Sequence, residues 1–383
     1  MPEPSRSERT VRAVELDVRT NSLNLIRLVL AFMVLFAHGF YLAGLGTGPG
    51  FRGENLGGWA VFGFFTVSGY LITASRFANP FGTYLLHRVA RIFPAFLICL
   101  VVTAGIFAPV AWWTEHRGLS GFLSTGTSPI EYVLSNALLK VNAMDVAGTP
   151  GPVPYPGAWN GSLWTLWFEF GCYLIVGVLV CLPVVRRHRW LITVAFVGSI
   201  AVWANIDTLL PTFGGSTDIG LLARLVPPFL GGAVVQTVIR RVPLHAPRAL
   251  AATALAAASV SFIDGWGAQL AAPLIVYALL WLSTVLPSPA LIRRHDISYG
   301  AYIYAFPVQQ LLAYAGLHRL GVYAFDFVAV VATAVPAVLS WRFVERPVMR
   351  WARRAGRRST GPTGSAPPRV RTAEPSPDGL LRP

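Results

Sequence analysis

The stretch from Leu23 to Gly44 constrains the fold more than any other part of the chain. It contains about 20 mostly apolar residues, which is enough for one helix to cross a hydrocarbon core of roughly 30 Å. Two ionisable residues interrupt it, Arg27 near its start and His38 deep inside. Because ionisable groups at membrane depth are costly, we expect both side chains to face the protein interior, where they are candidates for function.

Arg27 and His38 are expected to share one face of this helix. At about 100° per residue their directions differ by roughly 20°, and about 16 Å separates them along the axis. One face therefore carries a guanidinium group near one membrane surface and an imidazole toward the other. The alternative is structural, with an arginine that snorkels to the interface and a histidine that is hydrogen-bonded inside a helix bundle.

The composition identifies a polytopic membrane protein. Hydrophobic residues make up 54% of the 383-residue chain and charged residues only 13%, about half the charge of a soluble domain. The net charge of +14 does not indicate nucleic-acid binding, because the arginines lie mostly in short loops and near the chain ends. The three cysteines show neither metal-ligand spacing nor a disulfide framework, so we expect no metal site.

The apolar runs predict an all-α bundle of about ten transmembrane helices. The expected spans cover residues 23–44, 56–76, 93–111, 162–182, 190–206, 219–239, 248–263, 268–286, 297–316 and 322–343. A loop over residues 112–160 is expected to contain a short helix at 130–141. The transmembrane domain would cover residues 21–350, and the polar, Arg-rich flanks 1–20 and 351–383 are expected to be disordered.

The distribution of arginines predicts the topology. An even number of spans places both termini on one side, and the loops on that side are rich in arginine, whereas the opposite loops carry only Arg52, Arg117, Lys140 and Arg319. The positive-inside rule therefore predicts cytoplasmic termini, an extracytoplasmic 112–160 loop and a multi-pass protein of the plasma membrane. No internal repeat is evident, which argues against an inverted-repeat transporter.

Two further spans carry polar residues within the membrane. Glu169 lies about seven residues, or roughly 10 Å, into the fourth expected span, which is close to the expected depth of His38. A carboxylate there would pair with the imidazole and fix its tautomer, unless each group is satisfied locally. In the second span, Gly63, Ser68 and Gly69 are small, which permits close helix packing or a narrow path for a slender ligand.

Charged residues on the side of the membrane where both termini are expected suggest a site for an anion. Arg88 and Arg91 follow the second expected span and share a face if that segment is helical. Guanidinium groups suit phosphate because they bind it bidentately, although positive-inside charge or lipid headgroup contact would also place them here. Glu345 is a lone acid among the arginines of this side, and we expect it to form an ion pair that positions one of them.

The ordered set of these motifs resembles the acyltransferase-3 family of integral membrane acyltransferases, over residues 23 to about 347. The matching motifs are Arg27 with His38, Phe64-Phe65-x-x-Ser68-Gly69, Arg88-x-x-Arg91 with Pro94, Leu163-Trp164-Thr165-Leu166-x-x-Glu169, Ile297-Ser298-Tyr299 and Phe343-Val344-Glu345-Arg346-Pro347. Family members usually carry an acid three residues before the first arginine. This chain has Asn24 there, so no salt-bridge partner for Arg27 is evident.

The resemblance implies a membrane O-acyltransferase. It would move an acyl group, expected to be acetyl, from acyl-CoA on the cytoplasmic side to a hydroxyl of a cell-envelope or exported glycan or of a glycosylated metabolite. The resemblance implies an essential histidine and arginine at His38 and Arg27, so the catalytic residues would be His38 as the general base, Glu169 as its orienter and Arg27 in contact with the donor. The residues expected to hold the donor are Arg27, Arg88, Arg91 and Ser68.

Two other functions remain open from the sequence. In a proton-coupled transporter or flippase, His38 would relay protons and the arginines would bind an anionic or glycan-linked substrate. A non-catalytic membrane scaffold is the third possibility. Consumption of acyl-CoA coupled to an ester product separates the enzyme from both.

Overall fold

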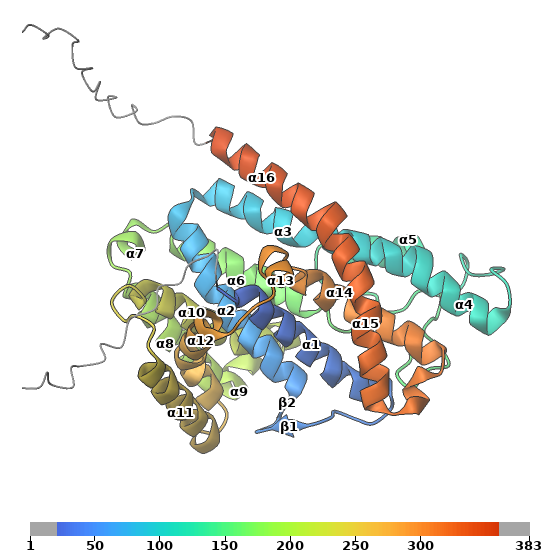
Figure 1. The fold of residues 1–383 in the computed structure, drawn as a ribbon, viewed down its shortest axis with the longest axis horizontal. Coiled ribbons are helices and arrows are strands. Elements are labelled where there is room, and N and C mark those ends of the chain that lie inside the picture. The colour runs from blue at the N-terminus through green and yellow to red at the C-terminus, as the bar shows by residue number, and fades with distance from the viewer. Residues whose placement is uncertain (1–20, 360–383) are drawn as a thin grey trace, which may run out of the picture.

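The computed structural model describes residues 21–359, which form an all-α membrane bundle (Figure 1). Within this range, the only strands that pair as a sheet are β1 (Gly50–Phe51) and β2 (Glu54–Asn55), which form a short antiparallel hairpin. The predicted fold class is therefore confirmed. The disorder expected for residues 1–20 lies outside the described residues.

Ten helices within residues 21–359 overlap the ten expected spans. They are α1 (Leu23–Leu42), α2 (Leu56–Ala78), α3 (Phe81–Val102), α6 (Thr165–Leu179), α8 (Leu191–Ala204), α10 (Thr217–Val238), α11 (Ala246–Phe262), α12 (Gly267–Val285), α14 (Ser298–Tyr314) and α15 (Val322–Ser340).

Not all of these helices are long enough to cross a membrane on their own. By length and apolar character six helical segments of the described chain qualify, or seven if the bent pair Leu191–Ala204 and Ile206–Phe213 forms one span. The expected count of about ten is not confirmed, because α6, α11 and α14 contain 15, 17 and 17 residues, at or below the usual minimum.

Short elements connect the long helices. They are η1 (Thr103–Phe107), α4 (Ala108–His116), α5 (Pro129–Asn136), α7 (Pro183–Arg187), α9 (Ile206–Leu209), η2 (Leu210–Phe213), α13 (Ala290–Arg294), η3 (Leu317–Leu320) and η4 (Trp341–Glu345). The short helix expected at residues 130–141 is present as α5. The loop expected at 112–160 begins later than predicted, because α4 extends to His116.

The third expected span begins much earlier than predicted. The prediction gives 93–111, but helix α3 begins at Phe81 and continues through η1 and α4, so that Arg88 and Arg91 lie on a helix and not in a loop. The arginines suggested a solvated turn, whereas Arg91 is largely enclosed by protein partners, with 13% of its side chain exposed. The positions of the arginines alone therefore predict the wrong starting residue for this helix.

The C-terminal segment also differs from the prediction. After α15 and η4, the chain continues as α16 (Arg346–Ser359), so the disorder expected from residue 351 is wrong as far as residue 359, while 360–383 lie outside the described residues. Helix α16 runs along α3 (Figure 1), where the absence of a side chain at Gly356 permits close approach to Thr83. This packing brings Arg346, Arg350 and Arg353 of α16 to the end of the bundle where α1 begins.

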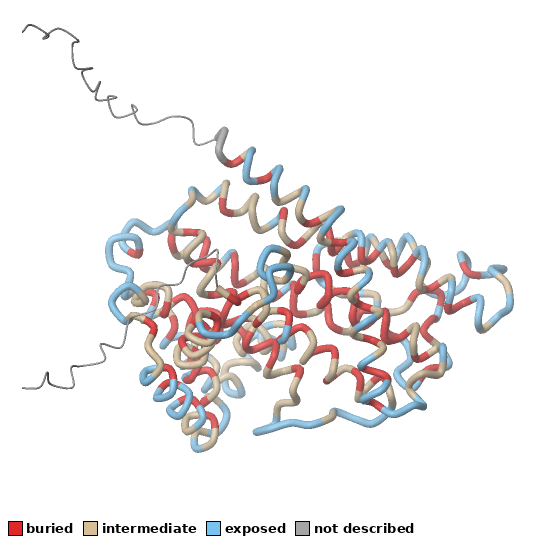
Figure 2. The backbone as a smooth tube through the Cα atoms, in the orientation of Figure 1, coloured by how far each residue is buried: buried red, intermediate tan, exposed pale blue. Residues whose placement is uncertain are grey.

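Small residues allow α2 and α10 to cross closely at the centre of the bundle. A Cβ atom added at Gly69 would lie 1.8 Å from the carbonyl oxygen of Phe229, and one at Gly232 would lie 2.0 Å from that of Thr66. Such contacts require glycine, so the close packing expected around Gly69 is confirmed. Buried residues concentrate in this central region, whereas the periphery is exposed (Figure 2).

Candidate active site

Three neighbouring cavities border helix α1. The basic cavity, of about 640 Å³, and the connecting cavity, of about 30 Å³, share Arg27 as a lining residue. The histidine cavity, of about 380 Å³, is bordered by His38 and shares Val61, Thr165 and Tyr302 with the connecting cavity. The shared residues place the three cavities in a row that runs from the basic cavity to His38, beside the helix that carries both Arg27 and His38.

The basic cavity is strongly positive. Eight arginines and one carboxylate line it, and they come from α1, α3, α13, α16 and the segment before α14. The arginines are Arg27, Arg88, Arg91, Arg293, Arg294, Arg346, Arg350 and Arg353. The last three were not predicted as site residues, although their spacing over about two helical turns is a signal that one helix face is basic.

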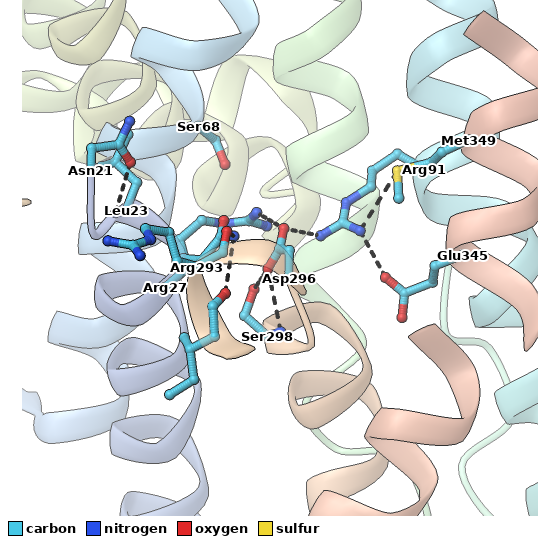
Figure 3. A network of polar contacts seen from close by, with 12 residues as sticks. Asn21, Leu23, Arg27, Ser68, Arg91, Arg293, Asp296, Ser298, Glu345 and Met349 are labelled. Atoms are coloured by element: carbon cyan, nitrogen blue, oxygen red, sulfur yellow. Dashed lines mark hydrogen bonds and ion pairs between the residues drawn. The ribbon is translucent and has the colours of Figure 1, made fainter. Parts of the chain in front are cut away.

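An ion-pair network fixes two of these arginines (Figure 3). Asp296 lies between Arg27 and Arg91 and forms an ion pair with each, the latter at 2.7 Å between Oδ2 and Nη2. The other side of Arg91 is bound by Glu345, with 2.7 Å between Nη1 and Oε2, which confirms the ion pair expected for this acid. Ser298 Oγ donates a hydrogen bond of 2.5 Å to Asp296.

Asp296 is a site residue that sequence reasoning missed. It supplies the salt bridge to Arg27 that Asn24 does not provide, and its position directly before Ile297-Ser298-Tyr299 was the available signal. Burial disfavours its ionisation, but Arg27 and Arg91 outweigh that effect and lower the pKa of Asp296 from 3.8 to about 2. Asn24 instead donates to the carbonyl oxygen of Arg293 at 3.0 Å, which anchors α13 against α1.

Arg88 differs from Arg91 in its partners. Arg91 is bound by two carboxylates, and its guanidinium also lies 5.4 Å from the ring centre of Tyr299. Among the described residues no carboxylate pairs with Arg88, whose guanidinium lies 5.9 Å from the rings of both Tyr84 and Tyr173. The buried Nε of Arg88 has no hydrogen-bond partner, so this side chain retains donors for an anionic ligand.

A hydrogen bond joins Ser68, which borders the basic cavity, to Glu169, which borders the connecting cavity. Glu169 Oε1 accepts hydrogen bonds from Ser68 Oγ at 2.9 Å and from Tyr173 Oη at 2.7 Å. The pair therefore lies where the basic cavity meets the connecting cavity, at the entrance of the narrow path that the sequence suggested. The cavity has room for only a few atoms, which suits a slender group.

Glu169 does not orient His38. Its hydrogen bonds go to α2 and to its own helix, and it borders the connecting cavity, whereas His38 borders the next cavity along the path. The expected pairing is therefore wrong. Similar depth in the membrane was the reason for it, but depth does not fix the direction in which a side chain leaves its helix.

His38 lies near the end of α1 without a hydrogen bond to any described residue. Its buried Nδ1 has no partner, and its ring contacts Phe306 edge to face, with 5.1 Å between ring centres. Because the imidazole also borders the histidine cavity, it is available to accept a proton from a hydroxyl bound there. Among residues 21–359, no group of three or more His, Cys, Asp or Glu side chains is arranged to hold a metal ion.

Comparison with known proteins gives consistent matches over the membrane part. Residues 20–341 match the family model of an acyltransferase domain. The chain is 30% identical over 345 residues to an O-acetyl transferase of Shigella phage Sf6, covering 86% of this chain and 96% of that protein. No solved structure matches.

Two further relatives cover the same share of this chain. Identity is 27% over 365 residues to Nodulation protein 10 of Rhizobium leguminosarum bv. viciae, covering 86% of this chain and 93% of that protein. It is 28% over 354 residues to a protein of Komagataeibacter xylinus named as the membrane-bound transacylase BcsY, covering 86% and 82%.

Proposed function

Because this chain belongs to the acyltransferase family whose domain it matches over residues 20–341, we propose that it transfers an acetyl group from acetyl-CoA to a hydroxyl of a glycan or glycosylated metabolite. The observation that carries the proposal is the path from a basic cavity, through a narrow connection, to an unpartnered histidine. A donor with a large anionic end and a small reactive end fits these three cavities in this order.

The basic cavity is suited to the phosphate groups of coenzyme A. Its arginines greatly outnumber its acids, and arginine binds phosphate through parallel charge-assisted hydrogen bonds. We assign these phosphate contacts to Arg88 first, because no described carboxylate forms an ion pair with it. Arg91 is held by Asp296 and Glu345, so its role is to position Asp296, and through it Arg27, rather than to grip the donor itself.

The reaction takes place where the connecting cavity meets the histidine cavity. His38 removes the proton from the acceptor hydroxyl, and the oxygen attacks the thioester carbonyl carbon. The carbon–sulfur bond then breaks, the ester is released, and the coenzyme A thiolate takes up the proton. Arg27 borders the donor side of this junction and supplies positive charge close to the path.

The arrangement also supports the predicted topology. Coenzyme A is a cytoplasmic compound, and the basic cavity lies at the end of the bundle where α1 begins and α16 follows η4. We therefore place both termini in the cytoplasm, the segment after α4 outside, and the protein in the plasma membrane.

The test is transfer by the purified protein in lipid nanodiscs. Acetyl-CoA labelled in the acetyl group is supplied with a panel of sugars, and free coenzyme A and acetylated sugar are quantified separately. An ester product formed with equal release of coenzyme A is expected. Substrate movement that requires a proton gradient, without an acylated product, would instead identify a transporter or flippase.

A further inference from the structure

A fourth cavity adjoins the histidine cavity. This side cavity, of about 490 Å³, shares Glu54, Gly58, Phe62 and Arg224 with the histidine cavity. Arg224 and Glu54 form an ion pair at the boundary between the two spaces. Each space lies within the range of roughly 300–1,000 Å³ that is typical of ligand pockets, so a ligand seated beside His38 has room to continue past this ion pair.

The charges around the side cavity cancel. Arg224 is paired with Glu54, and Arg52 is paired with Asp264, so both arginines that border the cavity are matched by carboxylates that border it too. This differs from the basic cavity, where arginines are in large excess. A neutral polar ligand fits this balance better than a phosphate or a uronic acid does.

The remaining lining, mostly glycine and aliphatic residues, includes three aromatic rings and one buried amide. Trp59 and Trp203 border the cavity, and their indole N–H groups donate to the carbonyl oxygens of Phe51 at 3.1 Å and Gly265 at 2.9 Å, which fixes both rings. Gln269 is only 5% exposed, and its buried Oε1 has no hydrogen-bond partner. Since a buried unpaired acceptor is costly, this oxygen is suited to receive a hydrogen bond from a ligand hydroxyl.

We propose that the acceptor is a neutral oligosaccharide whose reacting sugar lies beside His38 and whose adjoining sugar lies in the side cavity. The apolar face of that second ring packs on Trp203 or Trp59, a hydroxyl donates to Gln269, and the linkage passes the Arg224–Glu54 ion pair. This inference rests on the proposed function and adds the size and charge of the acceptor to it.

The experiment compares neutral acceptors of one to four sugar residues, built from glucose, galactose, mannose, rhamnose or N-acetylglucosamine. With the wild-type protein in nanodiscs, we expect kcat/KM for the acceptor to rise about tenfold or more from one residue to two, with smaller gains beyond. Trp203→Ala and Gln269→Leu should each remove most of this gain, while the KM for acetyl-CoA and transfer to a single sugar stay unchanged. Trp203→Phe should restore part of it.

Matched control variants make the same chemical changes elsewhere. Trp113 is an exposed tryptophan of α4, and Gln236 carries a buried unpartnered amide oxygen on α10, yet neither borders any of the four cavities. Trp113→Ala and Gln236→Leu should leave the length dependence intact.

Three results would decide against the inference. Equal transfer to single sugars and longer chains would remove the second sugar site while leaving the proposed function standing. A preference for anionic over neutral oligosaccharides would contradict the charge argument. Failure to acetylate any sugar while acetyl-CoA still binds would contradict the proposed acceptor class itself, and the inference with it.

Discussion

The basic cavity and the side cavity both contain arginine–carboxylate pairs, but they use them differently. At the basic cavity, Asp296 and Glu345 fix two arginines and leave the others in excess. At the side cavity, each of two arginines has its own acid. The same kind of ion pair therefore helps to assemble an anion site in one place and to neutralise a site in the other.

Under the proposed function, this difference lets one protein bind two unlike ligands in neighbouring cavities. In that proposal a charged donor enters at one end and a neutral acceptor at the other, and only the connecting cavity between them needs to admit the transferred group. Variants at one end should accordingly leave the ligand at the other end unaffected.

The largest effect is expected at the acceptor end of α1. His38→Ala should lower the transfer rate about 10²–10⁴-fold, because loss of a general base has that effect, while affinity for acetyl-CoA stays unchanged. Rates are measured with saturating donor, and donor affinity by calorimetry on the same preparations. His188→Ala, at an exposed histidine outside the four cavities, is the control. Near-normal turnover by His38→Ala would refute its catalytic role.

A loss of stability should follow when the ion pairs of the basic cavity are broken. Asp296→Asn leaves Arg27 and Arg91 without their shared carboxylate, and breaking a buried pair of this kind costs about 3 kcal/mol. The comparison is Asp264→Asn, since 90% of the Asp264 side chain is exposed and its loss should change the unfolding temperature very little.

The pH dependence of this stability follows from the pKa of Asp296. Because that pKa is lowered from 3.8 to about 2 in the folded protein, the contribution of the carboxylate is complete above about pH 5 and is lost as the pH falls toward 2. The difference in unfolding temperature between wild type and Asp296→Asn should therefore stay constant from pH 5 to 8. A difference that shrinks steadily within that window would contradict the assignment.

Donor affinity should distinguish the two arginines of the Arg88-x-x-Arg91 motif. Arg88→Ala should raise the Kd for acetyl-CoA about 10–100-fold, since charge-assisted hydrogen bonds contribute about 1.5–3 kcal/mol, and Arg88→Lys should restore it only in part. Arg91→Ala should mainly reduce the yield of folded protein, because Glu345 is fully buried and would lose its partner. Unchanged donor affinity in Arg88→Ala would remove this residue from the site.

The features that the sequence predicts correctly are those set by the geometry of a single helix. The helical period alone places Arg27 and His38 on one face, and both border the path of cavities. The small residues around Ser68 predicted close packing and a narrow path, and both are present near that residue.

Features that depend on how helices rotate against one another were missed. Asp296 lies 269 positions from Arg27 in the sequence, and no local pattern connects them. Trp203 and Gln269 meet at the side cavity from two helices that are far apart along the chain. Periodicity fixes the direction of each side chain relative to its own helix, whereas the pairing of Glu169 with Ser68 rather than His38 is fixed by the packing of α6 on α2.

The smallest expected effect concerns Glu169. Glu169→Gln keeps the size of the side chain and removes its charge, so we expect about a tenfold loss of transfer from a weakened hydrogen bond to Ser68 and reduced order at the entrance of the path. Because Glu169 and His38 border different cavities and do not touch, the variant that combines Glu169→Gln with His38→Ala should show the product of the two single losses, with a coupling free energy below about 0.5 kcal/mol.

Ser68→Ala provides the contrast to His38→Ala, since it removes the partner of the hydrogen bond that Glu169 accepts and should add little to the loss caused by Glu169→Gln. Single-turnover transfer, measured for all six proteins of the two cycles, tests both statements. If the Glu169→Gln and His38→Ala double variant is only as slow as His38→Ala, the two residues act as one unit, and the separation of donor and acceptor ends along α1 does not hold.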